Sequence, residues 1–180
     1  MKDTLISRRE FLKNLGVLGA GVLLSASPWL SAFSEVVETS NETCRLAIIG
    51  PGSRGRFLMS FLVQNPKVDI VALCDIYQPS IDEGLKLAPK AKVYKDYRKI
   101  LEDKMIDAVL VATPLNSHCR IVLDAFDAGK HVFCEKTIGF TMEECYRIYS
   151  KHISTGKIFF TGQQRLFDPR YIKTMEMVHA

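Results

Sequence analysis

A glycine-rich turn follows directly after an apolar run near residue 50. The run Leu46-Ala47-Ile48-Ile49 ends in Gly50-Pro51-Gly52-Ser53-Arg54-Gly55, which has the spacing Gly-x-Gly-x-x-Gly. Such a run is typical of a strand buried on both faces, and apolar residues at helical spacing follow the turn. Gly50 permits the tight turn, Gly52 lets the backbone approach a diphosphate, and Gly55 lets the helix pack closely. The sequence therefore predicts a dinucleotide site here.

The phosphate contacts and the choice of cofactor depend on four further residues. Pro51 has no N–H to donate, so we expect Ser53 and Arg54 to contact the phosphates at the helix N-terminus. A second apolar run, Val68–Cys74, ends at Asp75, 20 residues after the last glycine. A carboxylate there accepts hydrogen bonds from the adenosine ribose and repels a 2′-phosphate. The predicted cofactor is NAD, and NADP is the less favoured alternative.

A Glu135-Lys136 pair follows another apolar strand pattern, His131–Cys134. An ammonium beside a nicotinamide can orient the ring amide and hydrogen-bond the substrate hydroxyl that loses its proton. Partial desolvation would lower the pKa of this lysine towards the working range. We predict that Lys136 is catalytic and that Glu135 and Lys136 contact the cofactor. The alternative is an ordinary surface ion pair.

Two more polar segments follow predicted strands, at residues 113–118 and 162–165. In the first, Asn116 or Ser117 can cap the next helix, and His118 points from the first turn of that helix towards the cleft. The alternative is a strand-to-helix turn with no contact to a ligand. The candidate cofactor contacts from both segments are Thr113, Pro114, Asn116, His118 and Gln164.

Strand and helix patterns alternate between residues 44 and 162. Strands are expected at 44–49, 68–74, around 93, and at 106–112, 131–134 and 157–161. Helices are expected at 56–63, 79–88, 96–101, 118–129 and 141–156, with a last helix from Pro169 to Ala180. Each crossover is long enough for a right-handed βαβ unit, so the expected fold class is α/β, a doubly wound parallel sheet of the Rossmann type. Ligands then bind beyond the carboxyl ends of the strands.

Charge and cysteine content exclude some classes of function. The net charge is +4, but residues 1–34 contain four Lys/Arg against two acids, which leaves +2 and no electrostatic case for nucleic acid. The five cysteines contain no C-x-x-C, and no metal site is predicted. Cys74 and Cys134 end buried strands and are expected to act as small apolar residues.

The first 34 residues have the features of an export signal. Ser7-Arg8-Arg9-Glu10-Phe11-Leu12-Lys13 resembles the twin-arginine motif, and the uncharged stretch Leu15–Phe33 follows it. A membrane anchor is the alternative, because 19 uncharged residues nearly cross a bilayer, but glycines, serines and Pro28 make the stretch weakly apolar. We expect export by the twin-arginine machinery to a periplasmic or membrane-associated location. The expected organisation is a signal at 1–34, a linker at 35–43, a dinucleotide-binding domain at 44–162 and a connecting segment at 163–180.

A wider set of motifs resembles one enzyme family, the Gfo/Idh/MocA oxidoreductases, over residues 44–180. The motifs are Gly-x-Gly-x-x-Gly, Thr113-Pro114 with His118, Ala128-Gly129-Lys130-His131-Val132 before Glu135-Lys136, and Gln164-Arg165 with Pro169 and Tyr171. The resemblance implies NAD(P)-dependent oxidation or reduction of a sugar, inositol or similar polyol. It also implies that Lys136 is the shared lysine of the site, that Glu135 lies beside the nicotinamide, and that the full-length protein is a homo-oligomer.

The chain departs from the family pattern at two places. Thr137 stands where the family has proline after Glu-Lys, and the chain ends at Ala180. Family members carry a second domain, a large open sheet that walls the substrate pocket and supplies an Asp and a His to the proton relay. We therefore expect this chain to be a fragment that is inactive alone.

Three functions fit these residues. The favoured function is that of a dehydrogenase in which Lys136 acts as the acid–base group for the proton of the substrate hydroxyl. The alternative is an exported glycosidase of the same family, which oxidises a sugar carbon transiently, eliminates the aglycone and returns the hydride. That chemistry suits a compartment without free NAD, but that branch tends not to keep the lysine. The third possibility is a non-catalytic nucleotide or sugar sensor.

Overall fold

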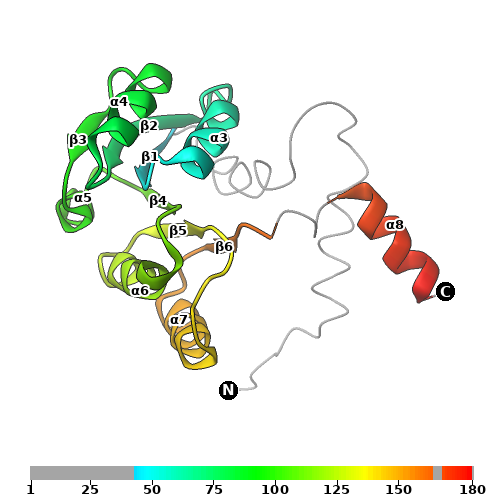
Figure 1. The fold of residues 1–180 in the computed structure, drawn as a ribbon. Helices are drawn as coiled ribbons and strands as arrows, with labels where there is room; N and C mark the ends of the chain where they lie inside the picture. Colours follow the sequence, from blue (N-terminus) through cyan, green and yellow to red (C-terminus); the bar gives the residue numbers. More distant parts are fainter. Residues whose placement is uncertain (1–42, 164–167, 180) are drawn as a thin grey trace.

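The computed structural model describes residues 43–163 and 168–179 (Figure 1). The predicted export signal and Gln164 lie outside the described residues. In chain order the elements are β1 (Cys44–Ile49), α3 (Ser53–Leu62), β2 (Val68–Cys74), α4 (Gln78–Leu87), β3 (Lys92–Tyr94), α5 (Tyr97–Glu102), β4 (Ala108–Val111), the 3-10 turn η2 (Leu115–Ser117), α6 (His118–Asp127), β5 (His131–Cys134), α7 (Met142–Thr155), β6 (Phe159–Thr161) and α8 (Pro169–Val178).

The strands form one parallel sheet in the order β3-β2-β1-β4-β5-β6. This confirms the predicted doubly wound α/β fold, and the strand order reverses direction between β1 and β4. The register of the strand pairs aligns the carboxyl ends of neighbouring strands along one edge of the sheet. Ile49 pairs with Cys74 on one side and Val111 on the other, and Cys134 pairs with Val111 and Thr161. The loops after β1, β2, β4, β5 and β6 therefore begin at the same edge of the sheet.

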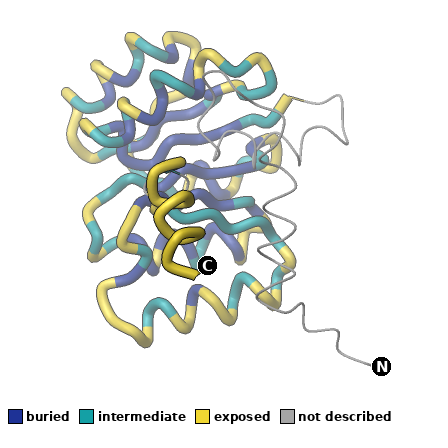
Figure 2. Tube along the Cα trace, turned by 90° about the vertical axis from the view of Figure 1, so that its right-hand side faces the viewer, coloured by how far each residue is buried: buried dark blue, intermediate teal, exposed yellow. Residues whose placement is uncertain are grey.

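Helices cover both faces of the sheet because the side chains of each strand alternate between two cores. Leu46 and Ile48 of β1 pack in one cluster, which includes buried residues of α3 and α4. Ala47 and Ile49 pack in the other, which includes buried residues of α5, α6 and α7. Figure 2 shows the sheet as the buried layer between these helices. Burial on both faces explains why the strand sequences are continuously apolar.

Capping residues set several helix ends. The capping box of Thr141 and Glu144 begins α7, and Gly156, at φ +63, ends it. Asp168 caps α8, and its carboxylate accepts from Arg170 N at 2.9 Å. Ser117, one of the two predicted cap residues, occupies the N-cap position of α6, but its side chain makes no capping hydrogen bond. Ser117 has helical φ and ψ instead of the extended conformation that an N-cap residue adopts, and its hydroxyl donates to Pro114 O at 2.7 Å.

The cysteines of the described domain are free thiols, and two of them end buried strands as predicted. Burial raises the pKa of Cys74 and of Cys134 to about 12, so both remain protonated apolar packing groups. Within residues 43–163 and 168–179, no group of three or more His, Cys, Asp or Glu is placed to hold a metal ion. None of the helices in the described part of the chain is long and apolar enough to cross a bilayer.

Candidate functional site

The three glycines of the turn differ in what surrounds them. Gly50 has φ +92, and a Cβ there would lie 2.8 Å from the carbonyl carbon and oxygen of Ala112. A Cβ on Gly55 would lie 2.2 Å from Gly50 O. A Cβ on Gly52 would meet nothing within 4 Å. The first and third glycines are therefore needed to build the turn, whereas the second leaves its backbone open to a ligand.

The N-terminus of α3 provides donors beside this open backbone. Gly52 is the N-cap residue and offers no side-chain cap. The first helical hydrogen bond runs from Arg56 N to Gly52 O at 2.9 Å. The N–H groups of Ser53, Arg54 and Gly55 lie in the first turn, before that bond, and are directed out of the N-terminus of the helix. With the positive end of the helix dipole, they form a suitable cradle for a diphosphate.

Arg54 and Glu135 form an ion pair across the carboxyl edge of the sheet. Arg54 Nε donates to Glu135 Oε1 at 2.7 Å, and Glu135 is only 4% exposed. The other carboxylate oxygen accepts from Lys136 N at 3.1 Å. The side-chain partner of Glu135 is thus Arg54, and the surface pair with Lys136 considered from the sequence is not formed. The guanidinium also lies over the ring of Phe57, 5.0 Å from its centroid.

Gly162 makes room for the carboxylate of Glu135, and the sequence reasoning did not assign it this role. A Cβ on Gly162 would lie 2.7 Å from Glu135 Cδ, and Gly162 N donates to Cys134 O at 2.9 Å. A side chain here would displace the carboxylate. A glycine that directly follows a strand, beside a strand ending in an acid, is the signal that could have indicated this contact.

His118 is buried instead of pointing into the cleft, so the expected orientation is wrong. The residue is 2% exposed, with Nδ1 2.8 Å from Thr137 O and Nε2 2.8 Å from Thr113 O. Both contacts are hydrogen bonds only when both ring nitrogens carry protons, and a neutral ring makes one of them. The reason for burial is that the first turn of α6 lies beside the loop after β5. His118 therefore positions the loop that carries Lys136.

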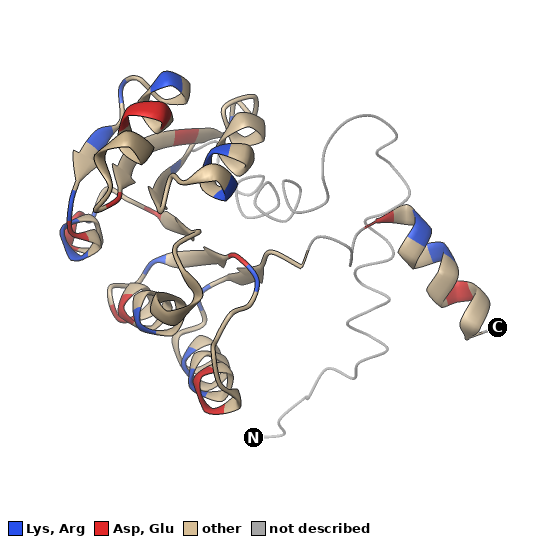
Figure 3. Cartoon of the chain, viewed as in Figure 1, with Lys and Arg blue, Asp and Glu red and all other residues tan. Residues whose placement is uncertain are grey.

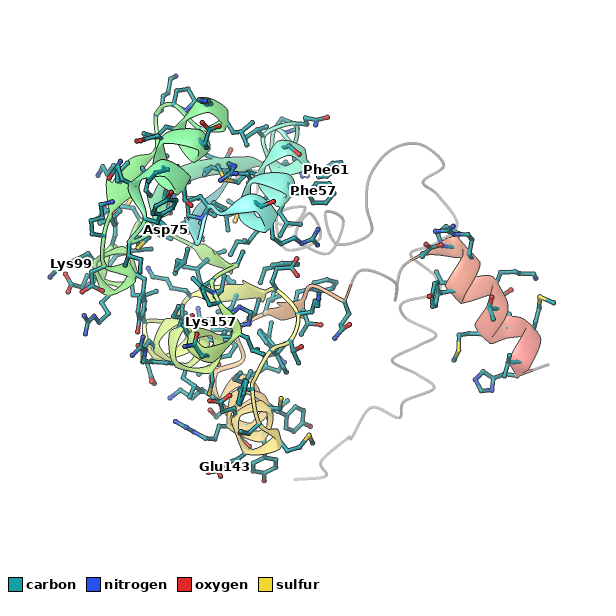
Figure 4. All side chains as sticks on the ribbon, viewed as in Figure 1. Phe57, Phe61, Asp75, Lys99, Glu143 and Lys157 are labelled. Carbon is teal, nitrogen blue, oxygen red and sulfur yellow. The ribbon has the colours of Figure 1, made fainter. Side chains whose placement is uncertain are left out.

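The remaining predicted residues occupy different surroundings. Asp75 is partly exposed beside the tip of β1 (Figure 4), and its Oδ1 accepts from Tyr77 N at 2.9 Å. Lys136 is exposed, and its ammonium makes no hydrogen bond or ion pair to other described residues. Thr113 N lies 2.9 Å from the Cβ position of Gly50, which brings the loop after β4 against the turn. Asn116 lines a separate groove of about 900 Å³ between α6 and α7.

The sheet order and the site together define a class of protein. A parallel sheet with a switch point between β1 and β4, a glycine turn leading into a helix, and an acid after β2 characterise a dinucleotide-binding Rossmann domain.

Comparison with known proteins identifies the family. Residues 44–163 match the family model described as the Gfo/Idh/MocA oxidoreductase family, NAD-binding Rossmann fold. The chain belongs to the Gfo/Idh/MocA oxidoreductase family.

The individual relatives are named for different activities. The chain is 29% identical to a glycosyl hydrolase family 109 protein of Stenotrophomonas maltophilia, over 96% of this chain and 39% of that protein. It is 31% identical to a myo-inositol 2-dehydrogenase of Thermotoga maritima, over 74% of this chain and 40% of that enzyme. A crystal structure of an NAD-binding protein from Listeria innocua superposes with a TM-score of 0.69 at 29% identity, over 77% of this chain and 40% of that one. The chain thus spans about 40% of the length of these relatives.

The environment of Gly52 allows a test of the cofactor site. Gly52 has φ −68, and its Cβ position is open, so Gly52→Ala should fold with an unchanged thermal midpoint. Because the added methyl occupies the space predicted for the diphosphate, the dissociation constant for NAD should rise at least about tenfold by calorimetric titration.

Gly50→Ala provides the contrast, since the strain at φ +92 and the contact with Ala112 should lower the thermal midpoint itself. Unchanged NAD binding by a folded Gly52→Ala protein would show that the diphosphate does not lie at this turn.

Proposed function

We propose that this protein is an NAD-dependent oxidoreductase that acts on a sugar or polyol. The observation that carries the proposal is the convergence, at one sheet edge, of the glycine turn, Asp75 and the Glu135-Lys136 pair. Membership of the family and the likeness to a myo-inositol 2-dehydrogenase support this class of substrate.

The residues have separable roles in the proposed reaction. Bound NAD supplies the acceptor for a hydride from the carbohydrate carbon. Lys136, as the neutral amine, hydrogen-bonds the hydroxyl on that carbon and receives its proton as the carbonyl forms. Because the Lys136 Nζ has no partner among the described residues, it is available to a ligand. Glu135, held by Arg54, fixes the start of the loop that carries Lys136.

A redox-neutral glycosidase is the second candidate. The likeness to a glycosyl hydrolase family 109 protein extends over 96% of this chain, which favours it. In that reaction a sugar carbon is oxidised, the aglycone is eliminated, water adds to the unsaturated ketone that results, and the hydride is returned. The presence of Lys136 favours the dehydrogenase, because the glycosidase branch of the family tends not to keep this lysine.

Two assays distinguish these candidates. Because the chain spans about 40% of its relatives, activity is best assayed in the full-length gene product. A dehydrogenase should form NADH from sugars or polyols, whereas a glycosidase should release the aglycone of chromogenic glycosides without net formation of NADH.

Lys136→Ala should lower kcat by about 100-fold or more, with a much smaller effect on NAD binding, because it removes the acid–base group. Lys90→Ala, which removes an exposed ammonium before β3, is the matched control. Full dehydrogenase activity in Lys136→Ala would exclude the assigned role, and absence of both activities in the unmodified enzyme would favour a sensor.

Asp75 should determine the preference for NAD over NADP. We expect Asp75→Ser to weaken NAD binding by about 10- to 100-fold, since hydrogen bonds to a charged group are lost, and to improve NADP binding by removing charge repulsion. The control is Asp69→Ser, which changes an exposed acid near the start of β2, whereas Asp75 follows the end of that strand. An unchanged ratio of the two dissociation constants would contradict this role.

We also propose that the protein is exported in the folded state with NAD already bound. The twin-arginine motif at residues 7–13 supports this, because that route carries folded proteins. Replacing Arg8 and Arg9 by lysine should retain the protein in the cytoplasmic fraction. The exported protein should release NAD on denaturation. Equal export of the variant, or exported protein that releases no nucleotide, would overturn this proposal.

A further inference from the structure

A small recess lies at the edge of the sheet where β4, β5 and β6 begin, opposite the edge that carries the dinucleotide site. It is called here the amino-edge recess, its volume is about 260 Å³, and the lining residues that matter are Lys104, Asp107, Gly129, Lys130, His131 and Lys157. His131 is the first residue of β5, whereas Lys104 and Lys157 precede β4 and β6. The loops before three neighbouring strands therefore bring three lysines and a histidine together.

Lys130 is the buried charge of the recess. The residue is only 4% exposed, and its Nζ donates to Asp103 O at 2.6 Å and to Ile106 O at 2.8 Å. An ammonium has three N–H donors, and the third finds no acceptor within residues 43–163 and 168–179. Both acceptors are neutral carbonyls, and no carboxylate of the same residues forms an ion pair with Lys130. Since a buried charge is stabilised by an opposite charge, this ammonium calls for an anion nearby.

Asp107 lines the recess, but its carboxylate is engaged by Arg45. Oδ2 accepts from Arg45 Nε at 3.1 Å and from Arg45 N at 2.8 Å, and Oδ1 accepts from Arg45 Nη2 at 3.0 Å. A bidentate pair of this kind uses both carboxylate oxygens. The charge of Asp107 is therefore balanced by Arg45, and the recess keeps the positive charge of its lysines.

Two further lysines of the recess have ammonium groups without a partner. The Nζ atoms of Lys104 and Lys157 make no hydrogen bond or ion pair in the described part of the chain. Elsewhere Lys, Arg, Asp and Glu are mixed over the helices (Figure 3), and helical lysines pair with acids three residues away, as Lys86 does with Glu83 at 2.5 Å. Like charges gathered in one recess repel each other unless an anion lies among them.

His131 adds a neutral donor to these charges. Its Nδ1 accepts from Ile158 N at 3.0 Å, so the proton of the neutral ring is on Nε2. Burial and, second to it, the charge of Lys157 lower the pKa of His131, which keeps the ring neutral at pH 7. A Cβ on Gly129 would meet Lys157 Cε at 3.9 Å and nothing nearer, so the backbone leaves the recess open on this side.

We propose that the amino-edge recess binds a phosphate ion. The donors are ammonium and imidazole N–H groups from three loops, and a phosphate has enough oxygens to accept from all of them, whereas a carboxylate has two. Lysine binds phosphate as a point charge, which suits the two ammonium groups without partners. The volume is smaller than that of a typical site for a drug-sized ligand, which favours a small free ion.

The bound ion should stabilise the fold, because it joins the loops before β4, β5 and β6 and neutralises their charges. This inference does not depend on the proposed enzymatic function, since the recess and the dinucleotide site lie at opposite edges of the sheet.

Calorimetric titration of the full-length gene product with inorganic phosphate tests the site. Saturating NAD should be present, so that phosphate does not bind at the glycine turn, and sodium chloride should keep the ionic strength constant. We expect millimolar affinity in the unmodified protein. Lys104→Ala with Lys157→Ala should raise the dissociation constant at least about tenfold, because two positive charges are lost from the recess. Phosphate should also raise the thermal midpoint of the unmodified protein but not that of this variant.

Lys67→Ala with Lys90→Ala is the matched control. It removes two other lysines that have no side-chain partner among the described residues and do not line the recess, so the net charge changes equally. Its phosphate affinity should stay within about twofold of the unmodified value, because distant charges are screened. Circular dichroism would verify that each variant is folded.

Four results would overturn the proposal. The unmodified protein might bind no phosphate, or the folded Lys104→Ala, Lys157→Ala variant could bind it as tightly as the unmodified protein does. An equal loss of affinity in the control would show a general effect of net charge. Acetate that binds as tightly as phosphate would show that the recess does not select a phosphate ion.

Discussion

The close approach of the glycine turn to the strand beside it determines the geometry of the site. Gly50 lies so near Ala112 that a side chain at position 50 would meet the backbone at 2.8 Å, and a Cβ on Gly55 would lie only 2.2 Å from Gly50 O. These contacts hold the N-terminus of α3 at the point where the strand order reverses. The open backbone at Gly52 and the position of the first turn of α3 are consequences of this packing.

The buried charge of Glu135 links the two ends of the site. A carboxylate that is 4% exposed requires partners, and it finds them in the Arg54 side chain and Lys136 N. Arg54 belongs to the helix proposed to bind phosphate, and Lys136 is the proposed acid–base residue. The ion pair between Arg54 and Glu135 therefore couples the position of the helix proposed to bind the diphosphate to the position of the loop that carries Lys136. Gly162 allows this arrangement by leaving space beside the carboxylate.

Local patterns in the sequence predicted most of the fold. Apolar runs, capping residues and glycine positions are properties of neighbouring residues, so the six strands, the ends of α7 and the start of α8 were predicted correctly. Contacts between distant segments were not. Arg54 and Glu135 are 81 residues apart, and no local pattern indicates that they meet. The burial of His118 likewise depends on the loops after β4 and β5 lying side by side.

The most direct test of the account is a crystal structure of the protein with NAD. The diphosphate should lie against Gly52 and the N–H groups of Ser53 and Arg54, with the adenosine ribose hydrogen-bonded to Asp75. The nicotinamide should lie beside Glu135 and Lys136. A diphosphate bound elsewhere, or a ribose that makes no contact with Asp75, would contradict the central claim.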